Sequence, residues 1–229
     1  TYKYLGPITT FLVMTDAAFK KEENTGHALK GTLVLRRATG SLNSGLVQLV
    51  DFITKRVSNV TRSTFSSELF SLCDACDHAL LLRQICQEFI GGALTAAQAR
   101  DMREGNRTSD VSIDVAVDAM SVYAAITASH IKIPAEKSLL SHLQYVRELL
   151  DKRVLNALLW VDTRDMAADG MTKGAVLRDA IVDNMNGKIL LKHQFKLWQP
   201  LLASTSSSSA VEPVPGEIAY FSVAETDQV

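Results

Sequence analysis

Four acidic residues stand where the chain is expected to change from one kind of structure to another. Asp16 ends an expected strand, Asp118 ends a second, Glu68 opens a long expected helix, and Asp169 lies in the first turns of the last helical segment. Carboxylates that are packed together repel one another unless divalent cations neutralise them. Oxygen ligands of this kind select Mg²⁺ or Mn²⁺. Two such ions, about 3.5–4 Å apart, can activate a water and stabilise a leaving oxygen in phosphodiester cleavage.

Glu68 is unusual because it lies on the apolar face of its helix. The apolar residues of that face recur at spacings of three and four, which places them with Glu68 on one side; they are Leu72, Ala75, Cys76, Ala79, Leu82 and Cys86. We interpret Glu68 as a side chain that reaches a metal at the sheet. The positive N-terminal end of the helix is expected to help keep it ionised.

Each of these acids also has an ordinary explanation when it is taken alone. Asp118 could N-cap a helix that begins at Ala119, and Asp16 could be a turn residue at the end of a strand. Glu68 could be a first-turn acid favoured by the helix dipole, and Asp169 could be a solvated helix residue. Only their joint placement at strand ends and helix starts favours a metal site.

The order of the expected elements predicts an α/β fold. Three apolar runs separated by turn residues indicate strands in a meander, and strand–helix–strand crossovers follow. Such an order implies a mixed sheet with helices on its faces. The first and fourth strands would be central in that sheet, and ligand sites form where strands of open sheets end. The expected strands are 8–19, 27–37, 46–56, 111–118 and 155–163, and the expected helices are 64–90, 95–105, 119–129, 134–153 and 164–185, the last broken near Gly170 or Gly174.

The length and composition of the sequence are consistent with one domain and an extension. The chain has 229 residues, of which 47% are hydrophobic, so it can bury a real core. We expect a domain over residues 1–190 and a flexible Ser/Pro-rich extension over 191–229. A net charge of −1 does not suggest an autonomous nucleic-acid binder. Since the chain does not begin with Met, we expect a processed product or a fragment.

Three cysteines are too few for a disulfide framework, and no apolar run is long enough to span a membrane. Cys73 and Cys76, with His78, form half of a zinc motif at most, and we interpret the two cysteines as buried apolar residues. Trp160 and Phe52 stand in the middle of expected strands, which predicts core positions for both.

Five segments between about residue 10 and about residue 186 resemble the ribonuclease H domain of copia-type LTR retrotransposon Pol polyproteins. The two most specific segments are the serine-rich helix start and the final Ala-Asp-x-x-Thr-Lys signature. In chain order the segments read "MTDAAF", "RSTFSSELF", "VAVDAMSVYAAI", "AEKSLLSHLQYVRELL" and "WVDTRDMAADGMTKG". The resemblance implies a ribonuclease H-like fold, a five-stranded mixed sheet with three antiparallel strands, then parallel strands, and helices on both faces.

The resemblance also implies an activity and its residues. It implies endonucleolytic hydrolysis of the RNA strand of RNA–DNA hybrids, with two Mg²⁺ or Mn²⁺ ions on Asp16, Glu68, Asp118 and Asp169. Asp162 and Asp165 lie close enough in sequence to be alternatives to Asp169, but they do not match the pattern. We expect them to be flanking or capping residues. Three basic residues near the expected cluster are candidates for phosphate contacts; they are Arg62, Lys137 and Lys173.

The implied partners are an RNA–DNA hybrid and the reverse transcriptase domain of the same polyprotein, with no membrane. The implied location is the cytoplasm, in a retroelement particle, or the nucleus.

The chain departs from the family pattern at several places. Ala18, Phe19 and Lys20 replace the residues usual after the first aspartate, Ser138 replaces a frequent histidine, and the segment 92–110 is long. Two alternatives therefore stay open. One is a catalytically inactive or domesticated module that binds nucleic acid or serves as a structural domain. The other is a different metal-dependent nuclease on a similar sheet, such as an exonuclease or an integrase core.

Overall fold

The computed structural model describes residue 5 and the ranges 9–19, 27–38, 42–174, 178–200 and 219–221. These ranges contain all four of the proposed metal-binding acids. They also contain Arg62, Lys137 and Lys173.

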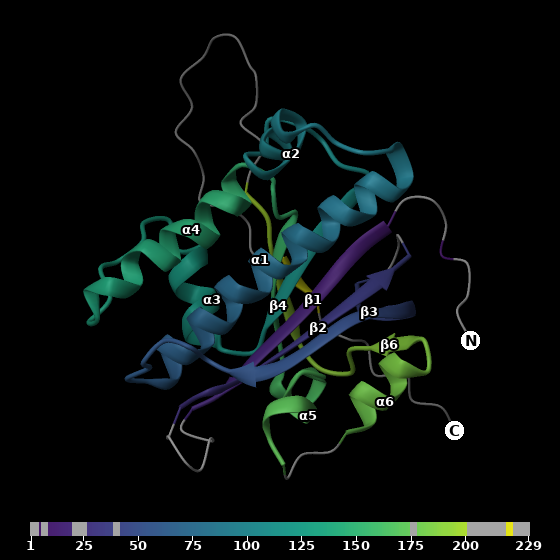
Figure 1. The fold of residues 1–229 in the computed structure, drawn as a ribbon. Helices are drawn as coiled ribbons and strands as arrows, with labels where there is room; N and C mark the ends of the chain where they lie inside the picture. Colours follow the sequence, from purple (N-terminus) through teal and green to yellow (C-terminus); the bar gives the residue numbers. More distant parts are fainter. Residues whose placement is uncertain are drawn as a thin grey trace.

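One mixed sheet forms the centre of the molecule (Figure 1). Its five central strands are β3 (Ser44–Arg56), β2 (Leu29–Arg37), β1 (Thr9–Ala18), β4 (Val111–Val117) and β5 (Ala157–Val161), in that spatial order. The first three strands are antiparallel, and β1, β4 and β5 are parallel. This arrangement confirms the expected mixed sheet.

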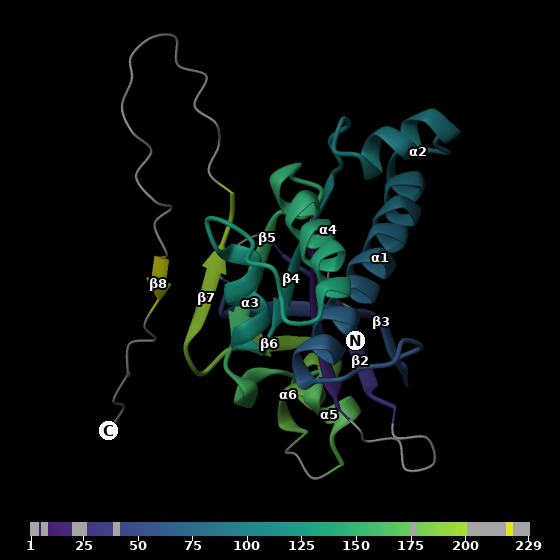
Figure 2. The same ribbon diagram turned by 90° about the vertical axis from the view of Figure 1, so that its left-hand side faces the viewer.

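The expectation of five strands is wrong, because the sheet has eight strands among the described residues. β6 (Lys188–Leu190) pairs with the start of β3, while β7 (Phe195–Trp198) pairs with β5 and β8 (Ala219–Phe221) with β7. Figure 2 shows β7 and β8 along the edge next to β5. β6 and β7 are only three and four residues long, too short to show the alternation of apolar and polar residues that predicts a strand. β7 and β8 both lie within the segment that we expected to be an extension.

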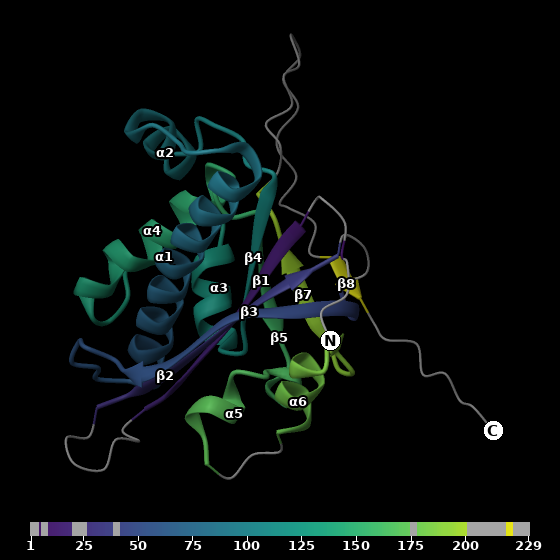
Figure 3. The ribbon, with the colours of Figure 1, turned by 45° about the vertical axis from the view of Figure 1, so that its right-hand side comes forward.

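Helices cover both faces of the sheet, as expected (Figures 1 and 3). On one face, α1 (Thr64–Gly91), α3 (Met120–Thr127) and α4 (Leu140–Asp151) pack over a core built around Phe11, Ile113 and Val115. On the other face, α5 (Asp169–Thr172) and α6 (Asp179–Met185) pack over a smaller core around Met14, Leu33 and Leu159. α2 (Ala96–Arg103) lies at one end of the molecule.

The apolar face of α1 packs as its spacing predicts. Leu72, Ala75, Cys76 and Ala79 are buried, and Leu82 and Cys86 are partly buried against the same core. The helix begins with a capping box, in which Ser63 Oγ accepts from Ser66 N at 3.1 Å and Ser66 Oγ accepts from Ser63 N at 3.0 Å. It ends at Gly91, and Gly92 has φ +85°, which suits glycine.

Two expected helices are shorter than predicted. The segment 134–153 becomes helical only at the 3₁₀ turn Lys137–Leu139 and continues as α4 from Leu140. The segment 164–185 divides into the 3₁₀ turn Thr163–Asp165, α5 and α6, with the break between α5 and α6 beginning at Lys173 and Gly174. The break that begins at Lys173 and Gly174 confirms the one predicted near Gly174. Periodicity did not reveal the late start of α4 or the separate 3₁₀ turn, because each short piece still presents apolar residues to the sheet.

Phe52 is not a core residue, because its side chain is 62% exposed. Phe52 lies on β3 and pairs with Leu33 of β2. On its other side β3 is joined by β6 only at Ser44–Leu46, so the part of β3 that carries Phe52 is a sheet edge among the described residues. Trp160 is partly buried against the larger core, which agrees with the prediction. In the part of the chain that the structure describes, no helix is long and apolar enough to cross a membrane.

Candidate metal centre

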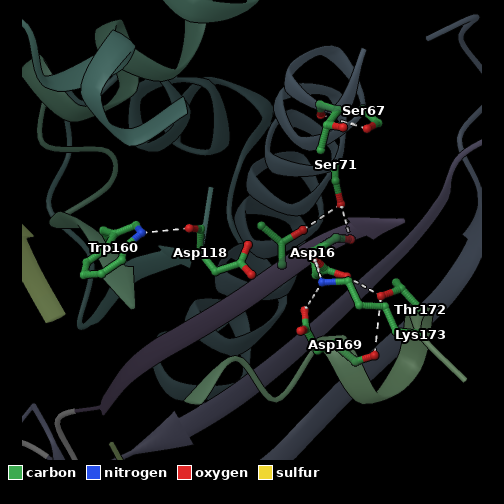
Figure 4. A network of polar contacts seen from close by, with 10 residues as sticks. Asp16, Ser67, Ser71, Asp118, Trp160, Asp169, Thr172 and Lys173 are labelled. Atoms are coloured by element: carbon green, nitrogen blue, oxygen red, sulfur yellow. Dashed lines mark hydrogen bonds and ion pairs between the residues drawn. The ribbon is translucent and has the colours of Figure 1, made fainter. Parts of the chain in front are cut away.

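Three of the four proposed acids meet at one end of the sheet (Figure 4). Oxygen atoms of Asp16, Asp118 and Asp169 all lie within 4.8 Å of one another. Asp16 and Asp169 are buried, and Asp118 is partly buried. Residues that lie up to about 150 positions apart in the chain therefore converge on one small volume.

The register of the parallel strands brings Asp16 and Asp118 together. Met14 of β1 is level with Ala116 of β4, so the residues two places further along each chain, Asp16 and Asp118, reach the same height. β1 continues past Asp16 to Ala18, whereas β4 stops at Val117. Asp118 does not cap α3, because the N-cap residue is Ala119 and it makes no side-chain cap bond.

A glycine on the neighbouring strand lets Asp169 approach. Gly31 is paired with Asp16 in the β1–β2 ladder, and α5 lies directly against it. A Cβ atom at Gly31 would stand 2.9 Å from Thr172 Cγ2 and 3.2 Å from the Ala168 carbonyl oxygen. Any larger residue at this position would push α5, and Asp169 with it, away from the sheet.

Glu68 reaches the same place from α1. It is the fifth residue of the helix, so it lies beyond the first turn, and the expectation of a first-turn acid is wrong. Its side chain is buried and accepts a hydrogen bond from the Ala17 main chain. The negative charges of Asp16 and Asp118 also interact with it. Its second oxygen, Oε2, is buried without a partner among the described residues, which is an atom that a cation would satisfy.

Burial and mutual repulsion favour protonated acids in the absence of a metal. Burial, and then the charges of Asp16 and Asp118, raise the pKa of Glu68 to about 9. Burial and the charge of Asp16 raise the pKa of Asp169 to about 7, and the same two causes raise the pKa of Asp118. The expectation that the helix end keeps Glu68 ionised is therefore wrong for the chain without metal, because desolvation is the larger effect.

Lys173 lies inside the cluster. Its ammonium group is 2.7 Å from Asp169 Oδ1 and 3.1 Å from Asp16 Oδ1. Burial acts to lower the pKa of Lys173, but the hydrogen bond to Asp169 and the charges of the surrounding carboxylates together outweigh it and raise that pKa. We predicted a phosphate contact for Lys173, whereas in this structure its partners are the acids themselves.

Four further residues hold the acids in place, and Figure 4 labels Ser71, Trp160 and Thr172 among them. The hydroxyl of Thr172 donates to Asp16 Oδ2, and the hydroxyl of Ser71 donates to the Asp16 carbonyl at 3.1 Å. Trp160 Nε1 donates to the Asp118 carbonyl at 2.7 Å, and the side chain of Thr163 bonds to that of Asp118. These hydrogen bonds were not predicted from the sequence, although Thr172 belongs to the Ala-Asp-x-x-Thr-Lys signature.

A cleft of about 680 Å³ opens beside the acids. It is lined by Glu68, Asp118 and Lys173, together with hydroxyls of Thr64, Ser121 and Thr163. Arg62 is exposed two residues before Thr64, and Lys137 is exposed at the start of its 3₁₀ turn. Neither of these two basic side chains lines the cleft.

The competing acids have other partners. Asp162 caps the turn that follows β5 by accepting from Arg164 N at 3.0 Å, and its carboxylate pairs with the Arg164 guanidinium. Asp165 pairs with His193, whose Nδ1 is 3.0 Å away. Cys73 and Cys76 are buried, and burial raises the pKa of both thiols, which agrees with their interpretation as apolar residues.

The donor set of the cluster suits a hard divalent cation. All four groups are carboxylates, three of which gather their oxygens within 4.8 Å while the fourth has an unpartnered buried oxygen. Oxygen-only sites of this kind are typical of Mg²⁺ and Mn²⁺. The residues that are present therefore fit the expected metal.

The sequence matches no protein-family model, and it matches no curated protein. Among solved structures, the chain is similar to the ribonuclease H1 of the halophilic archaeon Halobacterium salinarum, with 16% sequence identity and a TM-score of 0.46. The similarity covers 76% of this chain and 98% of that one.

Proposed function

We propose that this chain is a ribonuclease H-like nuclease that hydrolyses the RNA strand of RNA–DNA hybrids with divalent metal ions. The observation that carries the proposal is the convergence of Asp16, Asp118 and Asp169 within 4.8 Å, beside the unpartnered Glu68 oxygen. A site at the ends of parallel central strands, next to an open cleft, suits a polymeric substrate.

In this proposal the four acids hold two Mg²⁺ or Mn²⁺ ions. When bound, such ions supply the means to activate a water and to stabilise the departing oxygen of a phosphodiester. The protein's own side chains contribute by positioning the acids. Thr172 and Ser71 hold Asp16, and Trp160 holds the main chain of Asp118. RNA is distinguished from DNA by its 2′-hydroxyl groups in the wide minor groove, and the hydroxyls of Thr64, Ser121 and Thr163 line the cleft where such groups would lie.

The finer assignment rests on the sequence motifs alone. We propose that the chain derives from a copia-type retrotransposon polyprotein and works beside its reverse transcriptase domain, in a cytoplasmic retroelement particle or the nucleus. A preceding domain that binds most of the hybrid would account for the net charge of −1. Arg62 and Lys137 stay candidates for contacts with phosphate groups.

One observation favours the alternative, a module that binds nucleic acid without cleaving it. Lys173 already neutralises part of the negative charge of the cluster. The repulsion among the four carboxylates is therefore smaller without a metal than it would be without Lys173. The two functions differ in one measurable respect, because only the nuclease turns over substrate.

The test is cleavage of an end-labelled RNA–DNA hybrid in Mg²⁺ and in Mn²⁺. We expect wild type to cut the RNA strand, and Asp118→Asn to lose at least about 100-fold in rate, since even residues that support metal ligands cost about 10–100-fold. The matched control is Asp101→Asn, which removes an exposed acid from α2. Circular dichroism would check that both variants keep the fold. Binding of the hybrid by wild type without cleavage in either metal would support the inactive module instead.

A further inference from the structure

A second cavity lies at the opposite end of the sheet from the acids. It has a volume of about 190 Å³ and lies between the loop that follows α2 and the turn that follows α4. Figures 1 and 2 place α2 at one end of the molecule and α5 at the other. β4 connects the two places, because Val111 at its start lines the cavity and Asp118 follows its end, a span of roughly 20 Å at about 3.3 Å per residue.

The side chains around this cavity carry one sign of charge. Four cationic residues line it, and no carboxylate does so among the described residues; the four are Arg83, Arg107, Lys152 and Arg153. The other polar groups of the lining are hydroxyls and an amide, from Thr108, Ser109, Ser112 and Asn156. A small cavity of this composition attracts an anion.

Arg83 is the central feature because it is a buried charge that has no acidic partner in the ranges that the structure describes. Its side chain belongs to α1 and is only 4% exposed. Nη1 donates to the Val154 carbonyl at 2.7 Å and Nη2 donates to the Met102 carbonyl at 2.9 Å, and both acceptors are neutral. Nε is buried with no acceptor in the described part of the chain. Burial lowers the pKa of Arg83 to about 10, so the guanidinium remains charged at neutral pH while lacking a counter-charge.

Close backbone contacts fix the walls of the cavity. Gly105 has φ +79°, and a Cβ there would lie 2.5 Å from the Lys152 carbonyl oxygen, so only glycine allows the two loops to meet. Arg153 has φ +58°, which turns the chain directly after Lys152. The two Arg83 bonds tie α1 to both loops, so the cavity is held from three sides.

The other three basic side chains of the lining differ in the partners that they contact. Lys152 pairs with Glu148, four residues earlier on α4, and also feels the charge of Glu104. Arg153 donates to the Pro200 carbonyl, which is neutral. The exposed side chain of Arg107 has no bonding partner within the ranges that the structure describes. Among the described residues, the three guanidinium groups of the lining thus have no carboxylate partner.

We propose that this cavity binds a phosphate group. Guanidinium groups present several N–H donors in a planar fork that matches the oxygens of phosphate, and a bound phosphate would supply the counter-charge that Arg83 lacks. The hydroxyls of Thr108 and Ser112 would add donors. The phosphate can come from the backbone of a nucleic-acid strand or from a free phosphate compound, and the experiment distinguishes the two.

The first arm of the experiment uses inorganic phosphate on the full chain, followed by NMR of the arginine Nε–Hε groups. We expect the Arg83 resonance to shift on titration, and Arg107→Gln to weaken the apparent affinity about three- to tenfold. Arg107 is chosen because its exposed side chain can be replaced without disturbing the fold, whereas loss of Arg83 would orphan two buried carbonyls. The matched control is Arg103→Gln, which removes a charge from the same end of the molecule without touching the cavity.

The second arm measures binding of an RNA–DNA hybrid and of single-stranded DNA by fluorescence anisotropy across a range of salt. If a strand phosphate occupies the cavity, Arg107→Gln should reduce the slope of log affinity against log salt by about 0.7–0.9, and Arg103→Gln should not. A response to inorganic phosphate with unchanged slopes would identify a free phosphate compound as the ligand. If neither probe distinguishes Arg107→Gln from Arg103→Gln, the proposal is wrong. Neither arm requires hydrolysis, so the result is independent of the nuclease assignment.

Discussion

Lys173 Nζ lies 2.7 Å from Asp169 Oδ1, four residues earlier in the chain, so the protein places a cation of its own among the acids. The same ammonium also contacts Asp16 at 3.1 Å. A divalent ion bound to these oxygens would compete with Lys173 for them. This competition leads to a direct prediction about metal affinity.

Replacing Lys173 by methionine should tighten Mg²⁺ binding by about tenfold, because a competing charge-assisted hydrogen bond is worth about 1.5–3 kcal/mol. The metal-free variant should also melt at a lower temperature, since its carboxylates lose a counter-charge. Isothermal titration calorimetry and thermal melts would measure the two effects. Lys132→Met, at an exposed position, is the control. Weaker Mg²⁺ binding by the Lys173 variant would contradict the competition.

The stability of the metal-free chain should fall as the pH rises. The folded-state pKa values of Asp169 and Glu68, about 7 and about 9, lie above the ordinary carboxyl value of about 4, so the native state holds protons that the unfolded state has already lost. Their contribution is thus most favourable below about pH 4, and it is lost as the pH rises through 7 and then 9. The slope is at most about 1.4 kcal/mol per pH unit for each group.

Glu68→Gln is the variant that tests this dependence, because it keeps the shape of the protonated acid. In the presence of a chelator it should be more stable than wild type near pH 8 and similar near pH 5, as measured by urea unfolding. Adding Mg²⁺ should stabilise wild type more than the variant. An identical pH profile for the two proteins would show that Glu68 is not protonated in the native state.

Trp160 should affect activity without contacting substrate, because its Nε1 holds the Asp118 carbonyl at 2.7 Å. Trp160→Phe removes that donor while keeping an aromatic ring, and we expect a loss of about 1 kcal/mol in stability and about 10–100-fold in metal affinity or rate. Chemical denaturation, Mg²⁺ titration and hybrid cleavage would measure these quantities. Trp198→Phe is the control, since Trp198 of β7 stacks with the guanidinium of Arg147 of α4. Equal effects of the two changes would indicate a general packing role.

The apolar face of α1 should carry much of the stability. Leu72 is fully buried, so Leu72→Ala should cost about 2–5 kcal/mol, which combines the lost burial and the cavity left behind. Leu81, on the same helix, is 55% exposed, and Leu81→Ala should change stability by less than about 0.5 kcal/mol. Urea unfolding would measure both, and similar losses for the two variants would contradict the packing of α1.

Local patterns in the sequence determined the elements and which side of each faces the core. The spacing of Leu72, Ala75 and Cys76 identified the packed side of α1, because that signal acts within one or two turns of helix. The serine-rich segment before Glu68 marked the start of the helix through the resemblance to a family motif. The ends of β1 and β4 were sufficient to group Asp16 with Asp118, because parallel central strands end at one edge. The order of the elements along the chain also predicted a mixed sheet with the first and fourth strands at its centre.

Only the tertiary structure decided how the distant pieces fit around those acids. It put Lys173 among the carboxylates, brought α5 onto Gly31, and added β7 to the edge of β5. It also buried Arg83 beside the loops of Gly105 and Arg153, with no carboxylate partner among the described residues. These relationships depend on contacts between segments tens of residues apart, and burial then sets the pKa of each group through desolvation. Neither spacing nor composition carries that information, because both describe neighbours along the chain rather than neighbours in space.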